Sequence, residues 1–283
     1  MSWRLRVIHT TALKYSSPVS VSFNEARMTP ADAGGQLLIS HELRIDPRCR
    51  VYAYQDYWGS AVDAFDVHGA HSSLQVISRN VVDTPEPSDR QPGLTWAVLR
   101  GSEVRDSWCE YLRPSQYVDD VAAGDARSEL VSVLRRCATP GEAVDAAIDA
   151  VRQQIVYTPG VTTVSTTAGE AWSHGRGVCQ DISHAMLSLL RAAGIPARYV
   201  SGYLYAGTGE IGETAVGDSH AWVEVWDGAW YPYDPTNGLA VGEGHVVVAR
   251  GRDYADVSPL KGVYAGGHSQ TLGVTVSVTR LPR

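Results

Sequence analysis

The sequence predicts an α+β protein, with an N-terminal antiparallel β-sandwich followed by a core of helices packed on an antiparallel sheet. Three observations carry this prediction. Residues 1–82 consist of β-branched and aromatic runs separated by Pro, Gly and Asp. After about residue 116 the apolar residues recur at helical spacing, and after residue 197 the runs become strand-like again. Helices that precede an antiparallel sheet are typical of the α+β class.

The first domain is expected to cover residues 1–82. Its runs are rich in residues that fit a pleated, half-buried surface, and they predict strands at residues 3–15, 19–28, 36–45, 51–59 and 72–82. The segment "DTPEPSDRQPG", residues 83–93, is polar and holds three prolines, as expected of a linker. Residues 83–115 are therefore a linker and connecting segment, and residues 116–283 form a second domain.

The second domain is expected to contain two clear helices. One begins at Thr139-Pro140-Gly141-Glu142, which is a capping box with proline at the first helical position. Its inward residues are Val144, Ala147, Ile148, Val151 and Ile155. The other helix begins near Cys179 and stops at Gly194-Ile195-Pro196. Strands are then expected at residues 197–205, 219–226, 229–236, 245–251 and 271–281.

The composition limits the classes of partner. A net charge of -7 and a pI of 5.7, without a Lys/Arg cluster, argue against nucleic acid or an anionic membrane as a partner. The N-terminal segment alternates as a strand does and lacks the apolar run of an export signal. We therefore expect a cytoplasmic protein with reduced thiols and no membrane span. The cysteines, which show no zinc-site spacing, are Cys49, Cys109, Cys137 and Cys179. No metal or cofactor is expected.

Cys179 lies in the first turn of its predicted helix. The free N–H groups and the positive dipole end there favour an anion, which for a cysteine is the nucleophilic thiolate. The alternative is that Cys179 is a small buried apolar residue, as free cysteines often are.

A cysteine nucleophile needs an imidazole as its base. His220 is the best candidate because it opens the strand "HAWVEVW", with Ala221, Val223 and Val225 on the opposite face. The other histidines have simpler interpretations. Surface positions are expected for His9, His41, His68 and His71, a packed core position for His184, and loops for His174, His245 and His268.

The hairpin that follows His220 sets where Asp234 lies. A two-residue Asp227-Gly228 turn would put His220 and Asp234 on opposite faces of the sheet. A three-residue loop Trp226-Asp227-Gly228, with a positive φ at Gly228, would pair Val225 with Ala229 and place His220 directly opposite Asp234. An acid–base role for His220 therefore requires the second turn.

Three segments resemble the core blocks of the transglutaminase-like superfamily: "GRGVCQDISHAMLSLLRAAGIPARYVSGYL", "DSHAWVEVW" and "WYPYDPTNG". Its bacterial cysteine protease branch also has an N-terminal β domain, so the resemblance covers nearly the whole chain. It implies a papain/transglutaminase-like core with Cys179 as the nucleophile, His220 as general base and acid, and Asp234 as the group that orients His220. The implied reaction is acyl transfer from the amide of a peptide or protein substrate through a thioester, without a cofactor.

Several alternatives stay open at this point. Water as the acceptor would make the protein a peptidase or amidase, which we favour, and an amine would make it a protein-glutamine transglutaminase. The protein could also be a catalytically silent binding module. Alternatively it could bind a metal, with the ligands Cys179, His184, His220 and Asp234. Candidates for oxyanion or substrate binding are Trp172, Gln180 and Trp222. The glycine-rich segment 206–218 is either a solvated loop or a lip of the active-site cleft.

Overall fold

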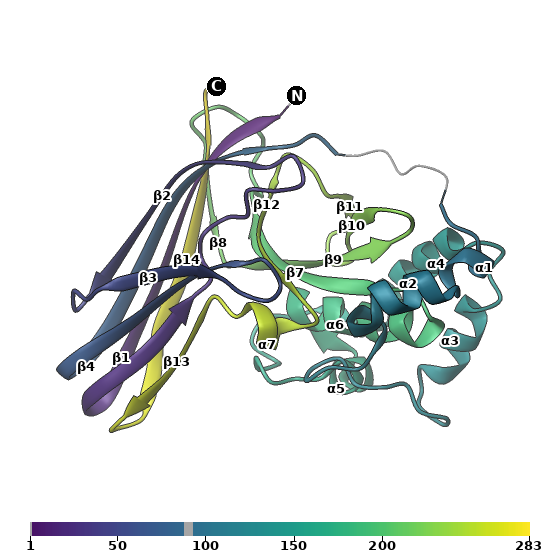
Figure 1. Ribbon diagram of the computed structural model, residues 1–283, viewed down its shortest axis with the longest axis horizontal. Coiled ribbons are helices and arrows are strands. Elements are labelled where there is room, and N and C mark those ends of the chain that lie inside the picture. The colour runs from purple at the N-terminus through teal and green to yellow at the C-terminus, as the bar shows by residue number, and fades with distance from the viewer. Residues whose placement is uncertain (1, 88–92) are drawn as a thin grey trace.

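The computed structural model describes residues 2–87 and 93–283, and it is an α+β structure with two main sheets (Figure 1). A large antiparallel sheet forms one side of the molecule, and a smaller sheet carries the helices on its far side (Figure 1). Part of the predicted linker, residues 88–92, lies outside the described residues. Among the described helices, none is both long and apolar enough to cross a bilayer.

The large sheet has seven strands in the order β2-β4-β1-β14-β8, with β3 also on β4 and β13 also on β1. Its strands are β1 (Trp3–Ala26), β2 (Leu37–Asp46), β3 (Val51–Gln55), β4 (Ala61–Thr84), β8 (Thr214–Gly217), β13 (Leu260–Ala265) and β14 (Ser269–Leu281). The N-terminal strands expected to form a sandwich thus lie in one sheet. This sheet also takes β14, which the sequence order had placed with the second domain, because β1 binds β4 along one edge and β14 along the other.

The long strands also correct an expected turn. The segment "DVHGAH" lies inside β4, which continues from Ala61 to Thr84. Gly69 has φ of 105°, and the register between β1 and β4 shifts in this region, so the glycine supports an irregularity within the strand and no reversal of the chain. The same sheet buries His9 and His71 and half-buries His41, which were expected at the surface. His71 packs against Tyr15 and His41 contacts Asn80 at 2.7 Å, both within the large sheet, whereas His9 faces the smaller sheet and contacts Tyr203 at 2.9 Å.

The smaller sheet has the order β11-β10-β9-β7-β12. Its strands are β7 (Ala197–Leu204), β9 (His220–Trp226), β10 (Trp230–Asp234), β11 (Leu239–Ala240) and β12 (His245–Gly251), while β5 (Val156–Tyr157) and β6 (Arg176–Gly177) form a separate parallel pair. The helices are α1 (Trp96–Leu99), α2 (Ser102–Ser107), the 3-10 helix η1 (Cys109–Leu112), α3 (Ser128–Leu134), α4 (Pro140–Gln154), α5 (Ala168–His174), α6 (Cys179–Ala193) and α7 (Tyr254–Val257).

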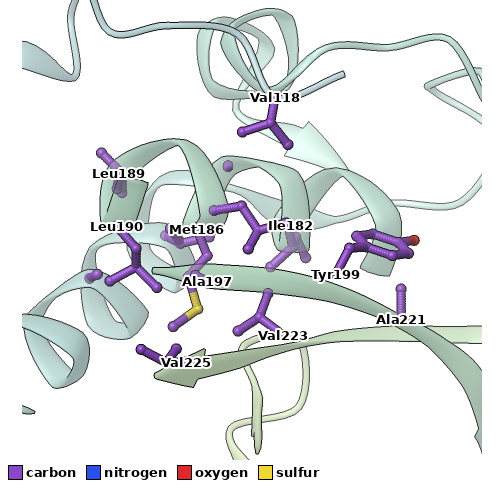
Figure 2. Packing of buried hydrophobic residues seen from close by; sticks show 14 of the residues in the cluster. Val118, Ile182, Met186, Leu189, Leu190, Ala197, Tyr199, Ala221, Val223 and Val225 are labelled. Carbon is purple, nitrogen blue, oxygen red and sulfur yellow. The ribbon is translucent and has the colours of Figure 1, made fainter. Parts of the chain in front are cut away.

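Helix α6 is the centre of the second unit, which consists of the smaller sheet and the helices packed on it. The predicted limits of α6 and the start of α4 are confirmed, with Thr139 accepting from the Glu142 N–H at 3.1 Å. Figure 2 shows the packing of α6 side chains, such as Met186, on β7 and β9 residues that include Ala197 and Val223. Because Ala221, Val223 and Val225 face the helix, the even-numbered residues of β9, beginning with His220, face the other way.

Candidate active site

Cys179 is the first residue of α6, and Val178 is the residue before it. The turn is held by Asp181, whose carboxylate accepts from the Val178 N–H at 2.8 Å and from the Thr162 hydroxyl at 2.7 Å. Gly177 is required there because a Cβ would come within 2.7 Å of the Asp181 Cβ. The thiol therefore sits at the predicted place, where the N–H groups of the first turn point away from the helix.

His220 lies beside both Cys179 and Asp234. Its Nε2 is 2.8 Å from Asp234 Oδ2, which confirms the predicted contact between the two residues. An ionised carboxylate only accepts hydrogen bonds, so Nε2 carries a proton and Nδ1 is left to interact with the Cys179 sulfur. Burial lowers the pKa of His220, but hydrogen bonds to Asp234 and Cys179 outweigh this effect and raise the pKa from 6.5 to about 9. The imidazolium is thus the favoured form at neutral pH.

The hairpin between these residues differs from the expected one in register. Trp226 pairs with Trp230, so the loop is Asp227-Gly228-Ala229 and the residue opposite Asp234 is at position 222, two residues from His220. Direct opposition was therefore wrong, although both side chains lie on one face as predicted, and Gly228 has the predicted positive φ, 89°. The observed register is favoured by an aromatic contact, because the rings of Trp226 and Trp230 pack across the hairpin with centroids 5.5 Å apart.

Asp234 is fully surrounded by donors. Its Oδ2 accepts from Asn237 Nδ2 at 2.8 Å and lies 3.3 Å from Nε2 of His245. Its Oδ1 accepts from the backbone N–H groups of Thr236 and Asn237 at 3.0 and 3.1 Å. Burial alone would raise the pKa of Asp234, but the hydrogen bonds from His220 and His245 hold it well below its usual range. The carboxylate is therefore ionised and fixed in orientation.

Sequence reasoning missed His245 and Asn237. His245 was expected in a loop, but it is 5% exposed and is the first residue of β12. His174 likewise ends α5, whereas His268 does lie in a loop. A signal for His245 existed, because it opens "HVVVARG" as His220 opens "HAWVEVW". Asn237 could have been found from the Asp-x-x-Asn spacing, which is typical of a turn that closes on the aspartate side chain.

A cleft of about 430 Å³ contains Cys179 and His220. Its other walls come from Tyr157, from Thr236 and Asn237, from the end of β7, and from β8 and β14. The segment 206–218 therefore contributes a wall of the cleft, and residues 214–217 of it form a paired strand.

The three candidates for oxyanion or substrate binding are absent from the lining of this cleft. Trp172 packs in the core, and the Gln180 side chain donates to the Val164 carbonyl at 3.0 Å. Trp222 is fully buried, and its ring lies 5.3 Å from that of His245, behind the His220–Asp234 pair. Their role in binding substrate or an oxyanion stays a prediction, and the contacts of Trp222 indicate packing.

His184 occupies a packed core position, as predicted. It is completely buried, accepts from the Tyr254 N–H at 3.2 Å, and burial lowers its pKa to about 3. A different group of possible metal ligands is present in the described residues, because atoms of His220, Asp234 and His245 all lie within 4.8 Å of one another. Hydrogen bonds already account for their arrangement, and a cation there would displace the proton on Nε2 that aligns His220.

Comparisons with known proteins agree with this architecture. Residues 129–235 match the model of the transglutaminase-like superfamily, and residues 5–83 match that of the bacterial transglutaminase-like N-terminal region. An uncharacterized protein of Mycobacterium leprae is 41% identical over 283 residues, covering 99% of each chain. One from Mycobacterium tuberculosis is 32% identical over 302 residues, covering 97% of this chain and 92% of the relative.

A solved structure supports the fold. The crystal structure of "a Putative Cysteine Protease" from Cytophaga hutchinsonii superimposes with a TM-score of 0.79 at 20% identity, covering 100% of this chain and 92% of the other. At this identity the likeness concerns the fold alone. The family models and the mycobacterial relatives show that the chain belongs to the transglutaminase-like superfamily and carries the N-terminal region of its bacterial members.

Proposed function

We propose that the protein is a transglutaminase-like cysteine peptidase or amidase with the catalytic residues Cys179, His220 and Asp234. One observation carries the proposal: a single imidazole, in a cleft, contacts a thiol at a helix N-terminus and a fully buried carboxylate at 2.8 Å. A nucleophile, a base and a group that orients the base are the parts that acyl transfer needs. We also keep the cytoplasm as the proposed location, since a reducing compartment maintains the thiol.

The mechanism follows from the hydrogen bonds. Cys179 Sγ attacks the amide carbonyl carbon, and the backbone N–H of Cys179 stabilises the oxyanion that forms. His220 then gives its Nδ1 proton to the departing amine, the C–N bond breaks, and a thioester remains. In the second half, His220 Nδ1 takes a proton from water, the hydroxide attacks the thioester, and the C–S bond breaks. The products are an amine and a carboxylic acid, and the thiolate of Cys179 and the imidazolium of His220 are regenerated.

His245 and Asn237 act as positioning residues in this proposal. The Gly242 N–H donates to Nδ1 of His245 at 3.4 Å, so the proton of a neutral His245 is on Nε2, which faces Asp234. Asn237 supplies a further donor to the same oxygen at 2.8 Å. The two donors fix the orientation of the Asp234 carboxylate. The carboxylate in turn accepts the hydrogen bond from Nε2 that aligns His220. Residues that orient a reacting group in this way commonly contribute about 10- to 100-fold to activity.

A second candidate function is transfer to an amine. A Pseudomonas aeruginosa protein named "Protein-glutamine gamma-glutamyltransferase" is 42% identical over 69 residues, which cover 23% of this chain and 10% of that protein. Against this candidate, transfer to an amine requires aromatic or apolar walls that exclude water from the thioester, and the tryptophans of the β9–β10 hairpin pack elsewhere. Trp226 and Trp230 form a cluster with Trp108, at centroid distances of 4.7 and 5.0 Å, and none of the three lines the cleft. We therefore favour water as the acceptor.

The two acceptors can be separated by mass spectrometry. The protein is incubated with a peptide library in H₂¹⁸O, with and without a primary amine such as cadaverine. Hydrolysis introduces ¹⁸O into new carboxyl groups, whereas amine transfer gives cadaverine adducts. Cys179→Ala is the control, and it should form neither product while its melting temperature stays equal or rises. Product formation by Cys179→Ala at the wild-type rate would overturn the proposal.

Thiol labelling tests the nucleophile without a substrate. Cys179 should react with iodoacetamide near neutral pH faster than Cys49, Cys109 or Cys137, because it combines a helix N-terminus with an imidazole partner. The comparison is demanding, since Cys109 is exposed and Cys179 is only partly so. Equal labelling of the four residues would favour a silent binding module.

A further inference from the structure

The edge of the large sheet beside Cys179 has an unpaired backbone. β8 ends the strand order and, among the described strands, pairs with β14 alone, through the partners Ala215–Val278, Val216–Ser277 and Gly217–Val276. In the described part of the chain, no hydrogen bond joins the backbone of Val216 to any strand on the other side. β8 is therefore an open strand edge, which is the usual template for adding another strand.

The register shows which groups point outward. The Arg280 N–H donates to the Glu213 carbonyl at 3.1 Å and the Arg280 carbonyl accepts from the Gly212 N–H at 2.7 Å, so both backbone groups of Arg280 point toward the β8 side. This direction alternates from residue to residue along a strand, so Val278 and Val276 also point their backbone groups toward their partners Ala215 and Gly217. Ala215 and Gly217 therefore bond to β14, whereas Thr214 and Val216 direct their N–H and C=O groups away from it.

The outward groups of Val216 lie in the wall of the cleft that holds Cys179. Ala215, Val216 and Gly217 all line this cleft, although successive side chains of a strand alternate between its faces. Ala215 and Gly217 share a face with their partners Val278 and Val276, which also line the cleft, whereas the Val216 side chain points the other way. Val216 therefore borders the cleft through its backbone, at the edge of the strand. The edge is also open, since Val216 is 73% exposed and a Cβ at Gly217 would have no neighbour within 4 Å. Thr214, in contrast, is outside the cleft lining.

We infer that the substrate is an extended peptide whose acyl side pairs with β8, exchanging two backbone hydrogen bonds with Val216. This inference rests on the proposed function of Cys179. The acyl side is assigned because the amine departs after the first half of the reaction, and only the acyl part stays bound through both halves. Backbone pairing of this kind gives affinity that depends little on sequence, and the apolar cleft residues Leu204, Val276 and Val278 would then select side chains.

Two electrophiles test the inference without a known substrate. Chloroacetone and acetyl-Ala-Ala-Ala-Ala chloromethyl ketone carry the same reactive group, and each alkylates a thiolate with loss of chloride. Only the second carries a peptide on its acyl side. We expect the peptide reagent to alkylate wild-type Cys179 about tenfold or more faster than chloroacetone, from two backbone hydrogen bonds.

Val216→Pro removes one outward N–H and leaves the bonds between β8 and β14 intact. The rate ratio should fall about fivefold in this variant. Thr214→Pro is the matched control, because it removes the other outward N–H of the same strand outside the cleft, and it should keep the wild-type ratio. An unchanged ratio in Val216→Pro, or an equal fall in both variants, would overturn the inference.

Amide exchange provides a measurement that needs no variant. The Val216 N–H should exchange quickly in the free protein, and it should be protected after alkylation by the peptide reagent but not by chloroacetone. Rapid exchange in both adducts contradicts the inference. Failure of the proposed function looks different, because chloroacetone would then label Cys179 no faster than the other cysteines.

Discussion

Two buried carboxylates lie on the same face of the β9–β10 hairpin, and they differ in their partners. Glu224 accepts from Arg198 and Arg250 at 2.6 and 2.9 Å, whereas Asp234 contacts His220 and His245 at 2.8 and 3.3 Å. An arginine keeps its proton at any pH relevant to folding, so the Glu224 cluster is a fixed arrangement of charge. His220, whose pKa is raised to about 9, can release its proton and take it back during a reaction. Burial of a carboxylate therefore does not by itself mark a reactive site. The reactive site is marked by a histidine partner whose second ring nitrogen is free to exchange a proton with a substrate.

The cavities beside the two clusters show the same difference. The larger, of about 750 Å³, is lined by Arg198, Glu224 and Arg250, whose charges satisfy one another. The smaller, of about 430 Å³, contains Cys179 and His220. If the active site were chosen by cavity volume alone, the larger cavity would be selected, although no nucleophile faces a base in its lining.

Replacing each carboxylate by its amide should give the largest difference between the roles of Asp234 and Glu224. Asp234→Asn should lower turnover about a thousandfold, because the amide no longer fixes the tautomer of His220, while the protein stays folded. Glu224→Gln should lower the free energy of unfolding by about 3 kcal/mol, because it leaves buried arginine charge without its partner, and its folded fraction should remain active. Chemical denaturation and turnover on the peptides found by mass spectrometry measure both effects. The contrast fails if Glu224→Gln loses as much turnover per folded molecule as Asp234→Asn.

The titration of His220 gives a pH dependence that the arginine cluster cannot give. Its folded pKa of about 9 exceeds the ordinary value of 6.5, so its protonated form stabilises the fold. This stabilisation is complete below pH 6.5 and is lost as the pH rises through about 9. Turnover should therefore fall about tenfold per pH unit above 9, as the acid that protonates the leaving amine is lost.

Alkylation provides the contrast to this pH profile. Iodoacetamide needs only the thiolate, so its reaction with Cys179 should not fall above pH 9. A parallel fall of alkylation and turnover would mean that something other than the His220 acid, such as unfolding, limits the reaction.

The positioning role of His245 predicts a smaller effect. His245→Leu removes one donor to Asp234 and should lower kcat about tenfold with KM nearly unchanged. His245→Gln places an amide donor near the same oxygen and should restore part of the loss. Steady-state kinetics on one identified peptide make the comparison. Equal kcat values for the two variants would indicate that His245 only fills space behind Trp222.

The local parts of the site could be predicted from the sequence, and its long-range parts could not. The start of α6 at Cys179, the face of His220 and the positive φ at Gly228 follow from spacing and turn chemistry within a few residues. The pairing of β14 with β1 and the approach of His245 to Asp234 depend on segments that chain order does not connect. The burial of His9 has the same origin, because its partner Tyr203 lies on the other sheet.

The hairpin loop offers the smallest effect and the clearest separation of fold from chemistry. Gly228 adopts φ of 89°, and a Cβ there would meet only Leu94, at an ordinary 3.5 Å. Gly228→Val should therefore lower the free energy of unfolding by about 1 to 2 kcal/mol, since the strain lies in the backbone conformation alone. The Trp226–Trp230 pair and the β9–β10 bonds hold the register from the other side of the loop, so the alignment of His220 and Asp234 should survive. Denaturation should show the loss while iodoacetamide labelling of Cys179 keeps its wild-type rate. A labelling rate that falls with the stability would mean that this loop, and not the aromatic pair, sets the register of the site.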